Sequence, residues 1–159
     1  MVYPDGAEHH SWWADTPQEE QAALTALAGL LGRLPGLPVV TWAGNSADLP
    51  RLVSAARRHD LYGLADALIA RHLDAYLWLQ RNARLPLLSL GLKDVAGYFG
   101  YRASTTITDG LDALMRYQAW LATKDEPIRA ELNAYNRDDI SALVHVIDRL
   151  TKLATAAAA

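Results

Sequence analysis

Hydrophobic residues recur every three or four positions along most of the chain, which predicts a helix-rich protein. The first predicted helix follows a possible cap at Asp15 or Thr16, with Pro17 early in the helix, and ends at Pro35. Further helices are predicted over residues 48–59, from about 89 to 99, over 109–122 and over 125–153. In the helix over 109–122 the helical period places these side chains on the inward face: Leu111, Leu114, Tyr117, Trp120 and Leu121.

Three short runs have the β-branched or aromatic character of strands. Residues 38–42 (PVVTW) are bounded by Pro and Gly and predict a buried strand. Residues 10–14 (HSWWA) have strand propensity, and residues 71–78 (RHLDAYLW) fit a strand that runs into a helix. Two or three strands are fewer than the roughly five of an ordinary sheet. We therefore expect an α/β fold with an incomplete sheet.

The length and composition narrow the class of protein. A chain of 159 residues fits one domain, which we expect over residues 1–153, followed by a disordered Ala-rich tail at 154–159. The sequence contains no cysteine, which excludes disulfides and thiolate metal sites. The net charge of −3 predicts no strong non-specific affinity for nucleic acid. No apolar run approaches the ~20 residues of a membrane span, and the polar N-terminus has no signal-peptide core, so we expect a cytoplasmic protein without a membrane partner.

Three segments carry candidate chemistry. In residues 39–52 (VVTWAGNSADLPRL) a strand leads to a Gly-Asn turn, and Asp48 then opens a helix. In residues 71–101 Asp74 ends a strand, and a Ser-Leu-x-Leu-Lys run later enters a short helix. In residues 134–143 (AYNRDDISAL) Tyr135 and Asp139 stand four positions apart, so they share one face of a helix.

In this order the three segments resemble the DEDDy-type 3′–5′ exonucleases of the ribonuclease H-like superfamily. The closest resemblance is to the predicted nuclease domain found beside RecB-like nucleases in bacteria, and it covers roughly residues 8–153. It implies a ribonuclease H-like α/β fold with a mixed sheet. It also implies metal-dependent hydrolysis of phosphodiester bonds in single-stranded DNA or RNA, with a RecB-like nuclease or helicase domain as a partner. The family uses two divalent cations, Mg²⁺ or Mn²⁺, which activate a water and stabilise the leaving oxygen.

The resemblance assigns roles to individual residues. Asp48 and Asp139 match metal ligands of the second and third motifs, and Tyr135 matches the tyrosine that orients the attacking water. Asp74 matches an aspartate that supports the site. Asp138 points about 100° away from Asp139 on a helix and is ranked as a second supporting residue. The residues that we expect to contact nucleic acid are Asn45, Arg84 and Lys93.

One departure from the family pattern is large. No Asp-x-Glu motif precedes Asp48, so the resemblance implies that the first strands and half of the metal ligands are missing from this sequence. We therefore expect the chain alone to bind metal weakly and to cleave slowly or not at all. The alternative is a degenerate nuclease fold that acts as a nucleic-acid-binding or protein-interaction module. In that case Asp48 is a helix cap, and Asp138 and Asp139 belong to a solvated helix face.

Overall fold

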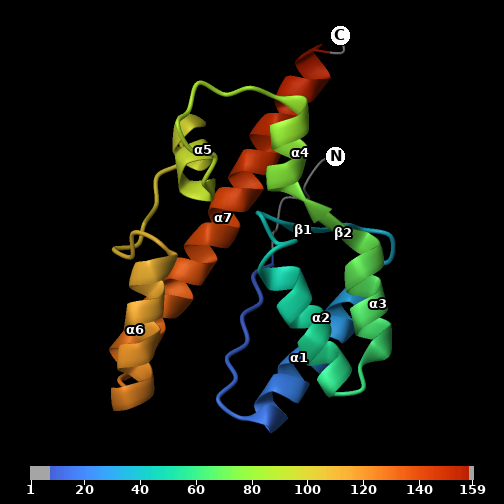
Figure 1. Ribbon diagram of the computed structural model, residues 1–159, viewed down its shortest axis with the longest axis vertical. Helices are drawn as coiled ribbons and strands as arrows, with labels where there is room; N and C mark the ends of the chain where they lie inside the picture. The colour runs from blue at the N-terminus through green and yellow to red at the C-terminus, as the bar shows by residue number, and fades with distance from the viewer. Residues whose placement is uncertain (1–7, 158–159) are drawn as a thin grey trace. The chain divides into compact units, whose positions relative to one another are not determined.

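The computed structural model describes residues 8–157. Its helices and strands follow one another along the chain as shown in Figure 1: α1 (Pro17–Arg33), β1 (Val39–Thr41), α2 (Asp48–Arg58), α3 (Tyr62–Arg71), β2 (His72–Asp74), α4 (Ala75–Asn82), α5 (Leu92–Tyr98), α6 (Gly110–Thr123) and α7 (Glu126–Ala157). The chain divides into two compact units, one formed by His10–Leu85 and one that contains Pro86 and the residues after it. The prediction of a single domain over residues 1–153 stays a prediction.

The first unit begins with a helix whose start is fixed by its sequence. The Thr16 hydroxyl accepts the amide N–H of Glu19, and the Glu19 carboxylate accepts the N–H of Thr16, which is a complete capping box. At the other end, the Arg71 guanidinium donates to the carbonyls of Leu31, Leu34 and Leu37 at 2.7–3.0 Å. These bonds satisfy backbone acceptors that the end of a helix leaves free.

The sheet is small and parallel. β1 pairs with β2 in the register Val39↔His72, Val40↔Leu73 and Thr41↔Asp74. Within residues 8–157 these are the two strands of the sheet, so the mixed sheet that we expected is not found there. The helix-rich α/β character and the two strands at 38–42 and 71–78 are confirmed, and β2 runs directly into α4 as expected.

The aromatic run at residues 10–14 is not a strand, and this prediction was wrong. These residues have no regular structure, and the Trp13 indole donates to the Asp15 carboxylate at 2.8 Å. The ring of His10 stacks on that of Trp12 at 5.8 Å. Strand propensity is realised only when another strand is available for pairing, and the described sheet pairs β1 with β2 alone.

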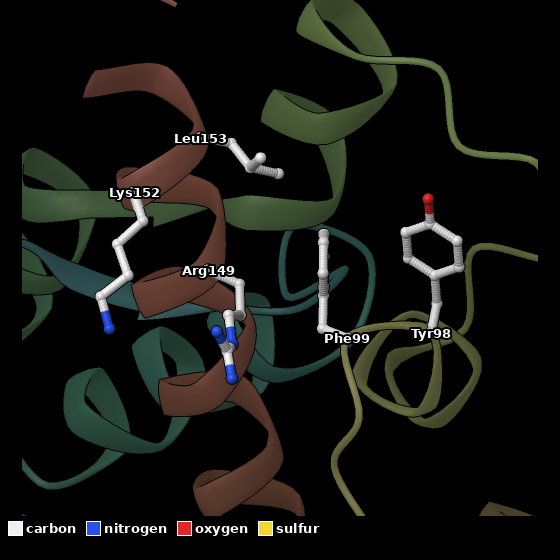
Figure 2. A pocket seen from close by; sticks show the side chains of 5 residues that line it. All are labelled: Tyr98, Phe99, Arg149, Lys152 and Leu153. Atoms are coloured by element: carbon white, nitrogen blue, oxygen red, sulfur yellow. The ribbon is translucent and has the colours of Figure 1, made fainter. Parts of the chain in front are cut away.

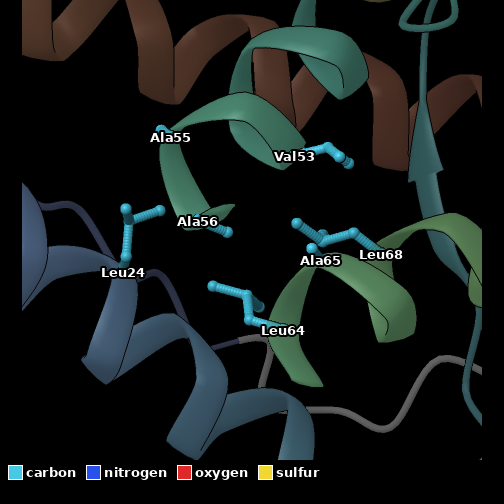
Figure 3. Packing of buried hydrophobic residues seen from close by; sticks show 7 residues of the cluster. All are labelled: Leu24, Val53, Ala55, Ala56, Leu64, Ala65 and Leu68. Atoms are coloured by element: carbon cyan, nitrogen blue, oxygen red, sulfur yellow. The ribbon is translucent and has the colours of Figure 1, made fainter. Parts of the chain in front are cut away.

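Helices α1, α2 and α3 enclose the core of the first unit. Figure 3 shows its buried side chains converging from the three helices: Leu24, Val53, Ala55, Ala56, Leu64, Ala65 and Leu68. Several are alanines, which let α2 and α3 approach closely. At the surface, Glu20 of α1 bonds Arg58 at 3.1 Å and His59 at 2.7 Å. The hydrogen bond from His59 holds the pKa of the Glu20 carboxyl below its usual value, with Arg58 adding to the effect.

The second unit consists of α5 and α6 packed against the long helix α7. Its buried apolar residues come from all three helices and the segment before α6: Val95, Ala96, Ile107, Trp120, Ala142, Val146 and Leu150. Asp109 is the N-cap of α6, and its carboxylate accepts the N–H groups of Leu111 and Asp112. Helix α5 begins at Leu92, three residues later than predicted. Helix α7 continues to Ala157, so residues 154–157 are helical where we expected a disordered tail.

The predicted inward face of α6 is largely exposed, which corrects the sequence analysis. Trp120 is 2% exposed, whereas Leu111 and Leu114 are 67% and 50% exposed. Tyr117 and Leu121 are also exposed, at 40% and 47%. Because α6 packs mainly against one other helix, α7, it buries a narrow line of side chains rather than the wide stripe that a larger core would cover. None of the described helices is long and apolar enough to span a membrane.

Candidate functional site

In the first unit, Asp74 fastens the loop between β1 and α2. Its Oδ1 accepts the N–H groups of Tyr76, Leu77 and Ala43 at 3.1–3.3 Å, and its Oδ2 accepts the N–H of Asn45 at 3.1 Å. The residue is 8% exposed. One carboxylate therefore caps α4 and also binds the backbone of a loop about 30 positions earlier. Both oxygens already accept hydrogen bonds from backbone amides, and the supporting role of Asp74 in a catalytic site stays a prediction.

The loop that Asp74 holds has a strained and close-packed backbone. Ala43 has a φ of +56°, the left-handed conformation that side chains disfavour. A Cβ on Gly44 would lie 2.1 Å from the Thr41 hydroxyl oxygen, so this position requires glycine. Asn45 bonds through its backbone while its side chain is exposed, which leaves the predicted contact of that side chain with nucleic acid open.

Asp48 is the first residue of α2 and is exposed to solvent. The N-cap is Ala47, which makes no side-chain capping bond. None of the hydrogen bonds found within residues 8–157 involves the Asp48 carboxylate, so the alternative that this residue is only a helix cap loses its support. The carboxylate is available to a ligand, and its metal role stays a prediction.

In the second unit, Tyr135 and Asp139 lie one turn apart on α7. The tyrosine hydroxyl and the carboxylate are close enough that each shifts the pKa of the other. Burial raises the pKa of the Asp139 carboxyl, and the positive charge of Lys93 and the bond from Tyr135 oppose that rise. Burial also raises the pKa of Tyr135 to about 12, and the charges of Asp139 and two further aspartates add to the effect. At neutral pH the Tyr135 hydroxyl therefore keeps its proton and remains a hydrogen-bond donor.

Lys93 of α5 completes this group. Its ammonium lies 4.4 Å from the centre of the Tyr135 ring and donates to the carbonyls of Ile107 and Thr108 at 2.8 and 3.1 Å. The cation–π contact and the two hydrogen bonds hold the lysine within its own unit. The geometry gives Lys93 a place beside Tyr135 and Asp139, and its predicted contact with a strand stays a prediction. Sequence reasoning singled out Lys93 but did not foresee these partners, which lie 14 and 15 positions away.

Asp138 is adjacent to Asp139 in sequence but lies in a different environment. It is 4% exposed, and its Oδ1 accepts the Tyr101 hydroxyl, the Ser104 N–H and the Ser104 hydroxyl at 2.9–3.1 Å. Its Oδ2 is buried without a hydrogen-bond partner among the described residues. Asp138 thus ties the irregular segment 101–104 to α7, and its supporting role in a catalytic site stays a prediction.

The remaining candidate residue, Arg84, follows α4 in the first unit. It is exposed and donates to the carbonyl of Gln80 at 3.0 Å. The structure therefore groups the candidates in two sets. One unit contains Asn45, Asp48, Asp74 and Arg84, and the other contains Lys93, Tyr135, Asp138 and Asp139.

The carboxylates of the described residues do not by themselves fit a complete two-metal site. No group of three or more His, Cys, Asp or Glu side chains that could hold a metal ion occurs within residues 8–157. Mg²⁺ and Mn²⁺ favour octahedral oxygen coordination, and the Asp74 and Asp138 oxygens already serve the protein. Asp48 and Asp139 are the candidate ligands that remain, so coordination of two ions requires further carboxylates.

A titration tests the environment of Tyr135. An ordinary tyrosine, with a pKa near 10, is about nine-tenths ionised at pH 11, whereas a pKa of about 12 leaves Tyr135 about one-tenth ionised. We expect the tyrosinate absorbance that Tyr135→Phe removes to be nearly absent at pH 11 in metal-free buffer. Because the folded pKa is raised, the stabilisation by the neutral hydroxyl is complete below pH 10 and is lost as the pH rises through 12. A Tyr135 signal with a midpoint near pH 10 would contradict this environment.

Comparisons with known proteins identify the family. A family model described as RNase_H superfamily matches residues 2–151, nearly the whole chain. No curated protein and no solved structure matches the chain. The chain belongs to the RNase H superfamily, and with that membership comes a nuclease-like fold.

Proposed function

We propose that the chain is a metal-dependent 3′–5′ exonuclease domain of the DEDDy type that acts on single-stranded DNA or RNA. The observation that carries the proposal is the Tyr135–Asp139 pair on one face of α7, where each group shifts the pKa of the other. Membership of the RNase H superfamily supports hydrolysis of phosphodiester bonds. The proposal includes a cytoplasmic location and a RecB-like nuclease or helicase domain as a partner.

In this proposal the residues of α7 and α5 together position the attacking water and a cation. Tyr135 keeps its proton at neutral pH and donates a hydrogen bond, which is what orienting an attacking water requires. Asp139 presents its carboxylate oxygens to a cation. Lys93 fixes the tyrosine ring from one face, and its ammonium lowers the pKa of the Asp139 carboxyl. Preorganised side chains of this kind contribute to the rate because they need no rearrangement during the reaction.

Two divalent cations, Mg²⁺ or Mn²⁺, belong to the proposal as cofactors, with Asp48 and Asp139 as two of the ligands. The chemistry that such ions supply is the activation of water and the neutralisation of charge on the phosphate. The described carboxylates are too few to hold both ions, so this proposal requires additional acidic ligands.

The same shortage of ligands favours a second candidate function. A nuclease fold without a complete metal site can bind a strand without cutting it, or bind another protein. This candidate predicts that nucleic acid binds equally well with EDTA and with Mn²⁺, and that no product forms.

The test is Mn²⁺-dependent degradation of a 3′-labelled single strand by the wild-type chain and by Asp139→Asn. We expect slow release of labelled mononucleotide by the wild type and a loss of at least 100-fold in Asp139→Asn, the order of effect of removing one preorganised catalytic group. Asp66→Asn is the matched control, since Asp66 is exposed on α3 and makes no described hydrogen bond. Equal rates for wild type and Asp139→Asn would reject the proposed site. No product from either, with strand binding retained, would favour the binding module.

A further inference from the structure

Aromatic and cationic side chains meet at a cavity of the second unit that the preceding site does not use. The cavity has a volume of about 410 Å³ and is lined by Tyr98, Phe99, Arg149, Lys152 and Leu153. Figure 2 shows the two aromatic rings at the end of α5 and the other three side chains projecting from α7. Its volume lies within the ~300–1,000 Å³ range of sites for small molecules.

The aromatic side of this cavity is accessible to a ligand. Tyr98 is 49% exposed, and its ring meets that of Phe99 edge-on, with centres 5.2 Å apart. An exposed aromatic face bordering a cavity is a surface on which a flat ring can stack, and nucleobases stack on such faces irrespective of their sequence.

The cationic side is suited to a phosphate. Arg149 is exposed and makes no hydrogen bond within the described residues, and the Lys152 side chain is 67% exposed. Asp148 pairs with Lys152 at 2.7 Å, which offsets one of the two positive charges. Exposed ion pairs of this kind are weak, so the ammonium can exchange its partner for a phosphate. The guanidinium provides a planar fork that binds two phosphate oxygens.

We propose that this cavity is a binding site for one nucleotide of a single-stranded polynucleotide, with the base against Tyr98 and Phe99 and the phosphate at Arg149 and Lys152. The inference rests on the proposed function, because it identifies how the same domain holds its substrate. Arg149 lies ten residues beyond Asp139 on α7, which is about 15 Å along the helix axis. The site therefore holds the strand at a distance from the Tyr135–Asp139 pair and takes no part in the reaction itself.

The experiment measures binding of fluorescein-labelled dT and rU strands of about 12 nucleotides by fluorescence anisotropy in EDTA. We expect Tyr98→Ala to weaken binding about fivefold or more, and Tyr98→Phe to bind like the wild type. Arg149→Ala with Lys152→Ala is expected to lower the slope of log affinity against log salt by about 1.4 for a single strand. Asp148→Asn, which removes the competing charge, is expected to tighten binding. A comparison of the dT and rU strands shows whether the site binds the DNA strand or the RNA strand more tightly.

The control replaces two exposed arginines of the other unit, Arg33→Ala with Arg57→Ala, and changes the net charge by the same amount. An equal loss in the control, or binding by Tyr98→Ala equal to that of the wild type, overturns the proposal. Absence of wild-type binding to both strands at low salt also overturns it. Because EDTA prevents metal-dependent cleavage, this result is independent of the Asp139→Asn test. Circular dichroism confirms that each variant retains its helices.

Discussion

Replacing Asp74 with alanine is expected to lower the free energy of unfolding of the first unit by about 3 kcal/mol, a large part of the 5–15 kcal/mol that holds an ordinary domain folded. The carboxylate accepts four backbone N–H groups while 8% exposed, so its removal leaves both the start of α4 and the loop after β1 without an acceptor. Loss of a helix cap costs about 1 kcal/mol, and hydrogen bonds to a charged group contribute about 1.5–3 kcal/mol.

Urea unfolding measures the change, and amide hydrogen exchange localises it. The amides that should lose protection are those of Ala43, Asn45, Tyr76 and Leu77. Asp66→Ala changes an exposed aspartate of the same unit and should alter stability by less than about 0.5 kcal/mol. Exchange at Ala43 and Asn45 that is unaffected in Asp74→Ala would show that another contact holds the loop.

Replacing Asp138 with alanine is the second substitution with a large expected effect, again a loss of about 3 kcal/mol. Three hydrogen bonds from Tyr101 and Ser104 end on one buried carboxylate oxygen, which alanine removes. The two Ser104 donors then lose their acceptor, and the Tyr101 hydroxyl keeps only its 3.3 Å bond to the backbone carbonyl of residue 138. Asp138→Asn keeps an oxygen in that position. Its amide group takes the place of the Oδ2, which has no partner among the described residues, and a neutral amide is less costly to bury than a charge. We therefore expect Asp138→Asn to lie within about 1 kcal/mol of the wild type.

A double-mutant cycle separates this contact from general damage to the fold. Ser104→Ala alone, Asp138→Ala alone and the two together should give a coupling energy of about 0.5–3 kcal/mol, the range for residues in one network. Additive effects of the two substitutions, or a loss in Asp138→Asn as large as that in Asp138→Ala, would show that the bonds to segment 101–104 do not stabilise the unit.

Local patterns predicted most of the elements of the fold. The helix after the possible cap at Asp15 or Thr16, the strand in the run PVVTW and the helix opened by Asp48 are all governed by neighbouring residues. The structure confirms each of these elements and places the first cap at Thr16. Two predictions failed because they depend on distant partners. The aromatic run at 10–14 has the composition of a strand, but the described sheet does not pair with it. The apolar stripe of α6 is real, but its burial depends on how many neighbours the helix has.

The candidate site residues show the same difference between what local spacing predicts and what distant partners decide. The four-residue spacing of Tyr135 and Asp139 was sufficient to place them together, and the helical angle separated Asp138 from Asp139. The backbone amides that Asp74 binds near β1 lie about 30 positions away, and the Lys93 acceptors lie in an irregular segment. The period of a helix or a strand does not relate residues that lie so far apart in the sequence. The roles of Asp48 and Asp139 as metal ligands, and of Asn45, Arg84 and Lys93 toward nucleic acid, stay predictions.

The three bonds of Arg71 have a consequence for protein engineering. Exposed connections between a helix and a strand normally tolerate inserted residues, which makes them attractive places for tags and grafted peptides. In the connection between α1 and β1, one guanidinium binds the carbonyls of Leu31, Leu34 and Leu37 and so fixes the path of the chain. An insertion between Leu34 and Leu37 would separate acceptors that a single rigid fork must reach together. This surface segment is therefore a poor site for grafting, although its exposure suggests a permissive one.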